Sequence, residues 1–185
     1  MEHLNEIQLS EGEAANLLLN MKQHASEIPL GATSEQVWNN LIESPVGTVI
    51  FGKNQKSKFK EKKREGQIRM AVETINRPDI ILEEKDLSGN NNHERKSSFL
   101  FVKTFKKKDT NSFTHFESVT VAQEGQEVSI SSHMIRENQL KKKMKSDRLL
   151  YIATALDESA TSSAEQPMQV GSLPSECKDK GLHSK

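Results

Sequence analysis

Two segments of alternating apolar and polar residues constrain the fold of this chain more than any other feature. They are FTHFESVTVA and QEVSISSH, separated by Glu124-Gly125. Successive side chains of a β-strand point to opposite faces of the sheet, so such alternation is typical of strands. Glycine in the second position of a two-residue turn accommodates the positive φ of a tight hairpin. The sequence therefore predicts an antiparallel hairpin over residues 113–133.

Regular pairing outward from this turn predicts which side chains share a face. One face is apolar and needs a cover of helices, whereas the other is rich in hydroxyl groups and free for solvent or a ligand. Glu117 and His115 fall on the face opposite His133. The pattern also fits a face that is merely solvated, with His133 in an incidental position. The expected pairs are Gln123 with Gln126, Val121 with Val128, Val119 with Ile130, Ser118 with Ser131 and Phe116 with His133.

The remaining segments predict an α+β domain around the hairpin. SSFLFVKTF is apolar at both parities and predicts a central strand, and DIILEE and RLLYI predict two more strands. From Ala153 onward the chain is Ser- and Glu-rich without periodicity. We expect an acidic helical segment (1–43), a compact domain (44–152) and a disordered tail (153–185). Helices are predicted over 4–24 with a break near Ser10, over 34–43, over the Lys-rich segment between Gly52 and Gly66 with Phe59 as its anchor, over 67–77 before Pro78, and over 134–145.

The charge of the chain is unevenly distributed. Residues 1–52 carry seven acidic residues and one basic residue, whereas 53–108 carry sixteen basic and eight acidic residues. Clustered lysines suit a phosphate backbone, although a run of lysines on a helix also fits a solvated surface. Lys103 differs from the other lysines because it shares its parity with phenylalanines of an apolar strand. A lysine in that place either extends to an edge of the sheet or belongs to a site.

Several classes of protein are not indicated by the sequence. Cys177 is the chain's one cysteine, so no internal disulfide forms. No common metal-binding or nucleotide-binding motif occurs, and we expect neither a metal nor a cofactor. No apolar run approaches the length of a membrane span and no leader opens the chain. A cytoplasmic protein without a membrane partner is the expectation.

Four segments together carry a resemblance to a known family. They are SPVGTVIFGKNQKSKFKEKKREGQIRMAVETINRPDIILEE, SSFLFVKTFKK, FESVTVAQEGQEVSISSH and RLLYI. Over about residues 44–152 the chain resembles the phage-associated barnase–EndoU–colicin–RelE-like (BECR) nucleases. The resemblance implies an α+β fold of N-terminal helices followed by a small antiparallel sheet of four to five strands, with one inserted helix. It also implies metal-independent cleavage of RNA by a protein of a phage or mobile element, often a toxin.

Such a nuclease needs a base for the ribose 2′-hydroxyl, an acid for the leaving 5′ oxygen, and donors that stabilise the charged phosphorane. The resemblance implies a basic residue on an early helix or strand and Ser, Thr, His or Arg residues on the later strands. The matching positions are Lys103, Ser118, Thr120, Ser131, His133 and Arg136. His133 is expected to be the general acid or base, Lys103 to contact phosphate, Ser118 or Ser131 to orient it, and Arg136 to stabilise the transition state. The expected contacts to nucleic acid are Lys53, Arg64, Thr120 and Lys106.

Two other functions stay open at this stage. The first is a catalytically degenerate module that binds nucleic acid or a protein partner without cleavage. The second is an accessory protein of a mobile element, whose acidic N-terminal helices bind a partner or mask the basic surface. The expected partners are RNA, including transfer RNA, and an immunity or mobile-element protein.

Overall fold

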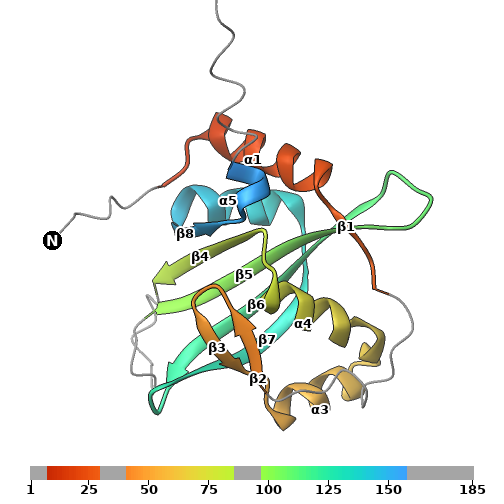
Figure 1. Cartoon of the computed structure of the whole chain (residues 1–185), viewed down its shortest axis with the longest axis vertical. Coiled ribbons are helices and arrows are strands. Elements are labelled where there is room, and N and C mark those ends of the chain that lie inside the picture. The colour runs from red at the N-terminus through yellow and green to blue at the C-terminus, as the bar shows by residue number, and fades with distance from the viewer. Residues whose placement is uncertain (1–7, 30–40, 86–96, 158–185) are drawn as a thin grey trace, which may run out of the picture.

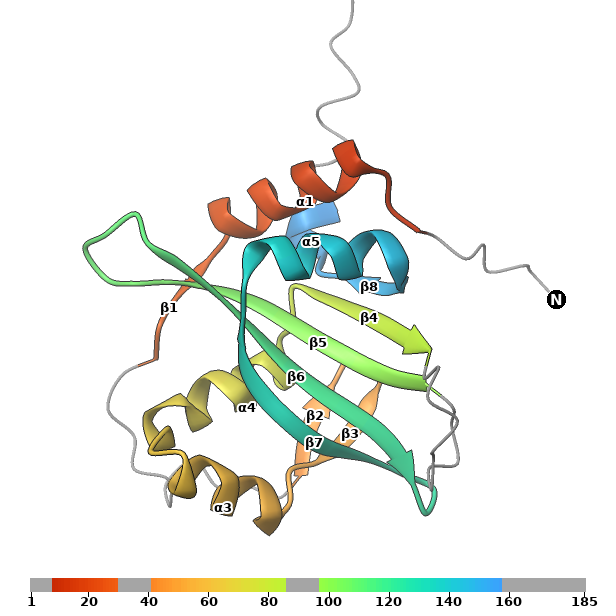
Figure 2. The same cartoon turned by 180° about the vertical axis from the view of Figure 1, so that it is seen from behind.

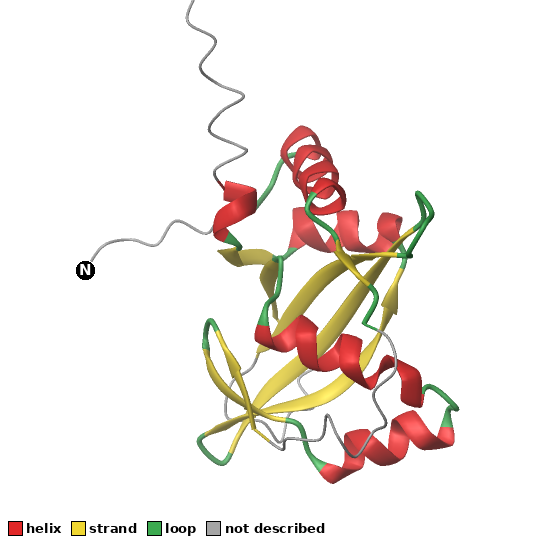
Figure 3. Ribbon diagram, turned by 45° about the vertical axis from the view of Figure 1, so that its right-hand side comes forward, coloured by secondary structure: helices red, strands yellow, loops and turns green. Residues whose placement is uncertain are grey.

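The computed structural model of the chain describes residues 8–29, 41–85 and 97–157. A curled β-sheet carries helices on both of its faces (Figures 1 and 3). Seven strands lie in the order β2-β3-β7-β6-β5-β4-β8, and β1 pairs with β5 beside this path. The strands are β1 (Ser26–Glu27), β2 (Leu41–Ser44), β3 (Gly47–Ile50), β4 (Ile80–Lys85), β5 (Ser97–Lys106), β6 (Phe113–Gln123), β7 (Gln126–Ile135) and β8 (Arg148–Ile152).

The helices are α1 (Glu11–Gln23), α3 (Lys53–Glu61), a 3₁₀ turn η1 (Glu65–Gln67), α4 (Ile68–Asn76) and α5 (Glu137–Ser146). Ser10, expected to break a longer helix, caps α1 in a capping box with Glu13. The Lys-rich segment is helical with Phe59 buried, as predicted, but α3 ends at Glu61, earlier than the predicted stop at Gly66.

The α+β class is confirmed, but the expected sheet of four to five strands was too small and its purely antiparallel pairing was wrong. Three strands were not predicted: β2 overlaps the segment that was assigned to a helix over 34–43, whereas β1 and β3 lie outside that segment. Residues 30–40 lie outside the described residues, and Leu41–Ser44 forms β2 instead. β2 pairs with β3 in a hairpin, and β3 pairs in parallel with β7. β1, β2 and β3 precede α3 and α4, so the part of the chain before the longer strands of the sheet is not purely helical.

Two hydrophobic cores lie on opposite faces of the sheet. On one face, here called the α5 face, α1 and α5 cover Ile80, Leu82, Leu100 and Val102. On the other, called the α4 face, α3 and α4 pack with Phe101, Phe105 and Phe116. In Figure 2, α1 and α5 lie together at the top of the molecule, and α3 and α4 lie together at the lower left. β5 contributes alternate residues to both cores, which confirms it as a central strand.

The β6–β7 hairpin differs from the predicted register by one residue. The turn is as expected, with positive φ at Glu124 and Gly125 and with Gln123 opposite Gln126. Thr120 is opposite Ser129, but its neighbour Val119 is opposite Ser131, so Ile130 is an extra residue in β7. This β-bulge reverses the parity of every β7 residue beyond it. The predicted pairs of Val119 with Ile130, Ser118 with Ser131 and Phe116 with His133 were therefore wrong.

The bulge also changes which residues are covered. The hydroxyl-rich face is the α4 face and is not free, because its members are at most 4% exposed. The α5 face is covered by helices at one end only, and Val119 and Val128 on it are half-buried. The buried hydroxyl residues are Ser118, Thr120, Ser129 and Ser132.

Candidate active site

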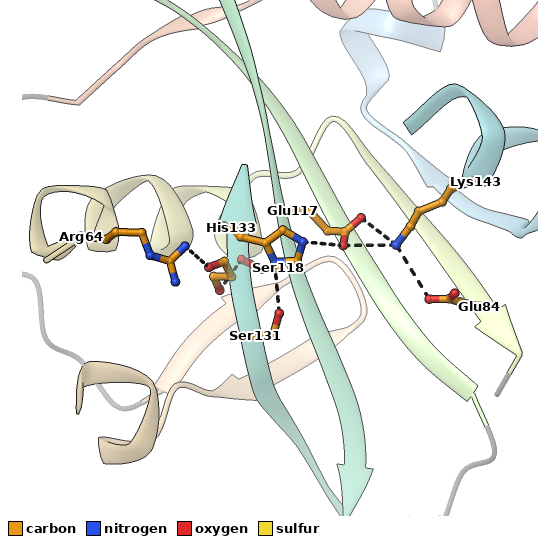
Figure 4. A network of polar contacts seen from close by, with 8 residues as sticks. Arg64, Glu84, Glu117, Ser118, Ser131, His133 and Lys143 are labelled. Atoms are coloured by element: carbon orange, nitrogen blue, oxygen red, sulfur yellow. Dashed lines mark hydrogen bonds and ion pairs between the residues drawn. The ribbon is translucent and has the colours of Figure 1, made fainter. Parts of the chain in front are cut away.

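An acid and an imidazole face each other across β6 and β7 on the α5 face. Glu117 lies directly opposite His133, and His133 Nε2 is 3.5 Å from Glu117 Oε1. The glutamate side chain is 1% exposed, whereas the histidine side chain is 45% exposed. The imidazole therefore stands between the solvent and a buried carboxylate (Figure 4).

Two further side chains hold this pair in place. Ser131 Oγ lies 3.2 Å from His133 Nδ1, so both ring nitrogens have a polar neighbour. Lys143 Nζ donates to Glu117 Oε1 and Oε2 at 3.3 and 3.2 Å. α5 buries Leu140 and Met144 in the core, and this anchoring places Lys143 over the sheet. The result is a chain of contacts from Lys143 through Glu117 and His133 to Ser131.

The side of the site nearest α5 is rich in carboxylates. Lys143 Nζ is also 3.9 Å from Glu84 Oε2, on β4. Asp147 follows α5, and partial burial raises the pKa of its carboxyl; the negative charges of Glu84 and Glu117 raise it further. Lys143 is thus the cation that compensates a group of acids beside His133.

The structure does not bring Lys103 to His133. Lys103 lies on the α4 face, opposite Phe116, with its side chain 10% exposed. Its Nζ donates to Arg77 O at 2.9 Å and lies 3.6 Å from Asp79 Oδ1. The lysine is therefore half of a buried ion pair on the side of the sheet away from the imidazole.

The other residues expected from the sequence divide into two groups. Ser131 and Arg64 lie near His133, the first bonded to its ring and the second at the edge of β7, where Arg64 Nη1 donates to Ser132 O at 3.3 Å. The rest do not join the site. Ser118 bonds to Ser132 at 2.9 Å beneath α4, Thr120 is buried beside Glu127, Arg136 is exposed at the start of α5, Lys53 is exposed at the start of α3, and Lys106 ends β5 near the tip of the β5–β6 hairpin.

The functional candidates that the sequence missed are Glu117 and Lys143. Regular pairing assigned Glu117 to the face opposite His133, and nothing in the sequence around Ile130 marks a bulge. Lys143 stands in the run LKKKMK, where its neighbours carry the same charge. The helical spacing of Leu140 and Met144 was the one available signal that Lys143 borders the core side of α5.

A second histidine, His115, is buried near α5 and is part of the framework. Its Nδ1 lies 2.8 Å from Thr104 Oγ1, and its Nε2 lies 3.5 Å from Glu137 Oε2, which also pairs with Lys22 at 2.6 Å. Burial lowers the pKa of His115, while Glu137 acts in the opposite direction. This network connects β5, β6, α5 and α1.

The fold and the site together define an α+β protein in which a buried glutamate faces a half-exposed histidine on a curled sheet. The model of the phage-Barnase-EndoU-ColicinE5/D-RelE like nuclease2 family matches residues 28–152. The chain therefore belongs to this family of phage BECR-like nucleases, and the resemblance drawn from the sequence is confirmed. No curated protein and no solved structure matches the chain.

The described residues contain neither a cluster of metal ligands nor a helix that could span a membrane. Among these residues, no group of three or more His, Cys, Asp or Glu side chains could hold a metal ion. No helix in the described parts of the chain is long and apolar enough to cross a membrane.

Proposed function

We propose that this chain is a metal-independent endoribonuclease in which His133 is the catalytic residue. The observation that supports this most is the facing pair on neighbouring strands, with the imidazole half exposed and Glu117 buried behind it. Histidine suits proton transfer near neutral pH better than any other side chain. Membership of a nuclease family adds support.

In the proposed reaction the ribose 2′ oxygen attacks the adjacent phosphorus, and the bond from phosphorus to the 5′ oxygen breaks. His133 takes the proton of the 2′-hydroxyl and returns it to the leaving 5′ oxygen, so protons balance within one group. The products are a 2′,3′-cyclic phosphate and a 5′-hydroxyl end. Glu117 stabilises the imidazolium formed between the two transfers, and Lys143 supplies positive charge for the phosphorane. Ser131 orients the ring.

The test is incubation of the purified protein with RNA in excess EDTA. Wild-type protein should cleave RNA and spare DNA, which lacks the attacking 2′-hydroxyl. His133→Ala should lower kcat by about 10²–10⁴-fold. Glu117→Gln should lower kcat with little change in KM, because a charge that acts in the transition state is lost. Arg136→Gln is the matched control. This variant should cleave RNA like wild type, because Arg136 lies at the start of α5 and outside the site.

One observation favours a second function. Lys143 already holds both oxygens of Glu117, and the carboxylate is 1% exposed, so the pair also fits a degenerate site that binds nucleic acid without cutting it. Salt-dependent binding that leaves RNA intact, with His133→Ala binding equally well, would favour this function over cleavage.

A further inference from the structure

A hollow of about 440 Å³ lies between α3 and the edge of β7, and His133 is one of the residues that line it. One wall comes from α3 and the turn after it, and the other is formed by consecutive residues of β7. The polar side chains that matter for its chemistry are Lys58, Lys62 and Arg64 on the first wall and Ser131 and His133 on the second.

Two of the three cations of this hollow are held in place by backbone carbonyls of β7. β3 pairs with β7 only at Glu127 and Val128, so later carbonyls on that edge of β7 are open to side chains. Lys58 Nζ donates to Ile130 O at 3.0 Å, and Arg64 Nη1 donates to Ser132 O at 3.3 Å. These bonds fix the two cations at the strand that carries His133.

Arg64 has bonding capacity left after this contact. Its guanidinium lies 5.3 Å from the centre of the Phe59 ring, which holds its plane, and its Nε is buried with no partner among the described residues. A buried donor without an acceptor is uncommon and costs stability. An oxygen atom of a ligand bound in the hollow would supply a hydrogen-bond acceptor for the guanidinium of Arg64.

The two sides of His133 differ in charge. The hollow holds three cations against one carboxylate, Glu61, and Lys62 has no ion-pair partner within the described ranges. On the other side, Glu84, Glu117 and Asp147 lie around Lys143, and Lys85 and Arg148 line one hollow together with Glu83, Glu84 and Asp147, so acids outnumber cations there. A polyanion that approaches His133 is therefore attracted more strongly along α3 than along the α5 side.

We propose that this hollow is a phosphate subsite for single-stranded RNA, which binds a phosphodiester next to the one that is cleaved. The assignment rests on the proposed function, because it takes His133 as the point where the backbone is cut. Lys62 and Arg64 contact the flanking phosphate, and Lys58 adds charge from the edge of the hollow. The RNA backbone thus crosses the edge of β7 between α3 and His133.

Binding of a short single-stranded 2′-O-methyl RNA, which is not cleaved, tests the subsite. Lys62→Gln should weaken binding about fivefold at low salt. It should also reduce the slope of log K against log salt by about 0.7, the value for one lost phosphate contact. Lys60→Gln is the matched control, because Lys60 is an exposed lysine near the end of α3, two residues before Lys62, and does not line the hollow. Equal slopes for the two variants would overturn the subsite.

A comparison of substrates separates this proposal from the proposed function. A dinucleoside monophosphate offers only the phosphate that is cut, whereas an oligonucleotide also offers its neighbours. Lys62→Gln should therefore lose more kcat/KM on the oligonucleotide, through KM, than on the dinucleotide. Equal losses on both substrates would refute the subsite while cleavage stands. A wild-type protein that binds but cleaves neither would refute the nuclease, and the salt slopes would still decide the subsite.

Discussion

Replacement of Lys103 by methionine should destabilise the fold and leave cleavage unchanged. The lysine and Asp79 are each 10% exposed in their side chains, with Nζ 3.6 Å from Asp79 Oδ1 and a second bond to Arg77 O. Asp79 also accepts a hydrogen bond from Thr104 N at 2.7 Å. Methionine keeps the length and the packing of the lysine stem but removes the charge, so Asp79 loses its cation.

The expected cost is about 3 kcal/mol of unfolding free energy. Breaking a buried ion pair by removing one partner costs roughly 3–5 kcal/mol. The lower end applies because the bond from Thr104 N remains and both side chains keep slight contact with solvent. For a chain of this size the melting temperature should fall by roughly 6–12 °C. Cleavage should match wild type at a temperature where both proteins are folded, because Lys103 lies on the face away from His133.

The dependence of this cost on pH adds an independent check. Burial raises the pKa of Asp79 above 3.8, and Lys103 opposes that rise, so the pKa is higher still in Lys103→Met. A raised carboxyl pKa contributes stability that is complete below the unfolded pKa and lost as pH rises through the folded one. The loss of unfolding free energy in the variant, relative to wild type, should thus become smaller as the pH falls from about 7 to about 4.5.

Urea unfolding at both pH values, together with a cleavage assay, decides the matter. A variant as stable as wild type would refute the argument from the buried pair, as would a deficit that grows in acid. A large loss of cleavage without loss of stability would place Lys103 at the site.

Three further predictions test the framework around the site. Burial lowers the pKa of His115 below 6.5, so the stability of wild type should fall as pH drops below that value; His115→Gln should flatten the fall in a urea titration between about pH 7.5 and pH 5. Leu18→Ala should cost about 2–4 kcal/mol because Leu18 is 3% exposed in the core, whereas Leu19→Ala, at an exposed position, should change urea stability little. Ser118→Cys with Ser132→Cys, in a chain freed of its native cysteine, should form a disulfide under oxidation, since the two hydroxyl oxygens are 2.9 Å apart; persistent free thiols would refute the bulged register.

Local patterns were sufficient for much of the fold. SSFLFVKTF predicted a strand buried on both sides because its two parities are both apolar, and β5 indeed feeds both cores. The turn at Gly125 followed from the need for positive φ, which is 72° there. Phe59 identified the buried side of α3 among lysines, because one aromatic residue in a polar helix has few other places to go.

The N-terminal strands depended on contacts that local patterns do not contain. Leu41 and Ile42 fit a helical face as well as a strand, since short apolar runs are ambiguous. Their conformation comes from pairing with β3, and β3 in turn adds to β7, which lies far along the chain. The S-P-V-G stretch forms the turn of the β2–β3 hairpin, in which Ser44 Oγ donates to Gly47 O at 2.6 Å.

A single residue, Ile130, prevented the candidate site from being predicted from the sequence. Regular pairing leaves His133 opposite Phe116 and puts Glu117 on the other face of the sheet. In that register Glu117 and His133 do not face each other. One extra residue at Ile130 reverses this and has a second effect at the same time: it pairs Ser118 with Ser132 on the buried face, where their hydroxyls bond to each other. Because both effects have one cause, they stand or fall together. A disulfide between positions 118 and 132 would therefore also support the placement of Glu117 opposite His133, on which the proposed chemistry rests.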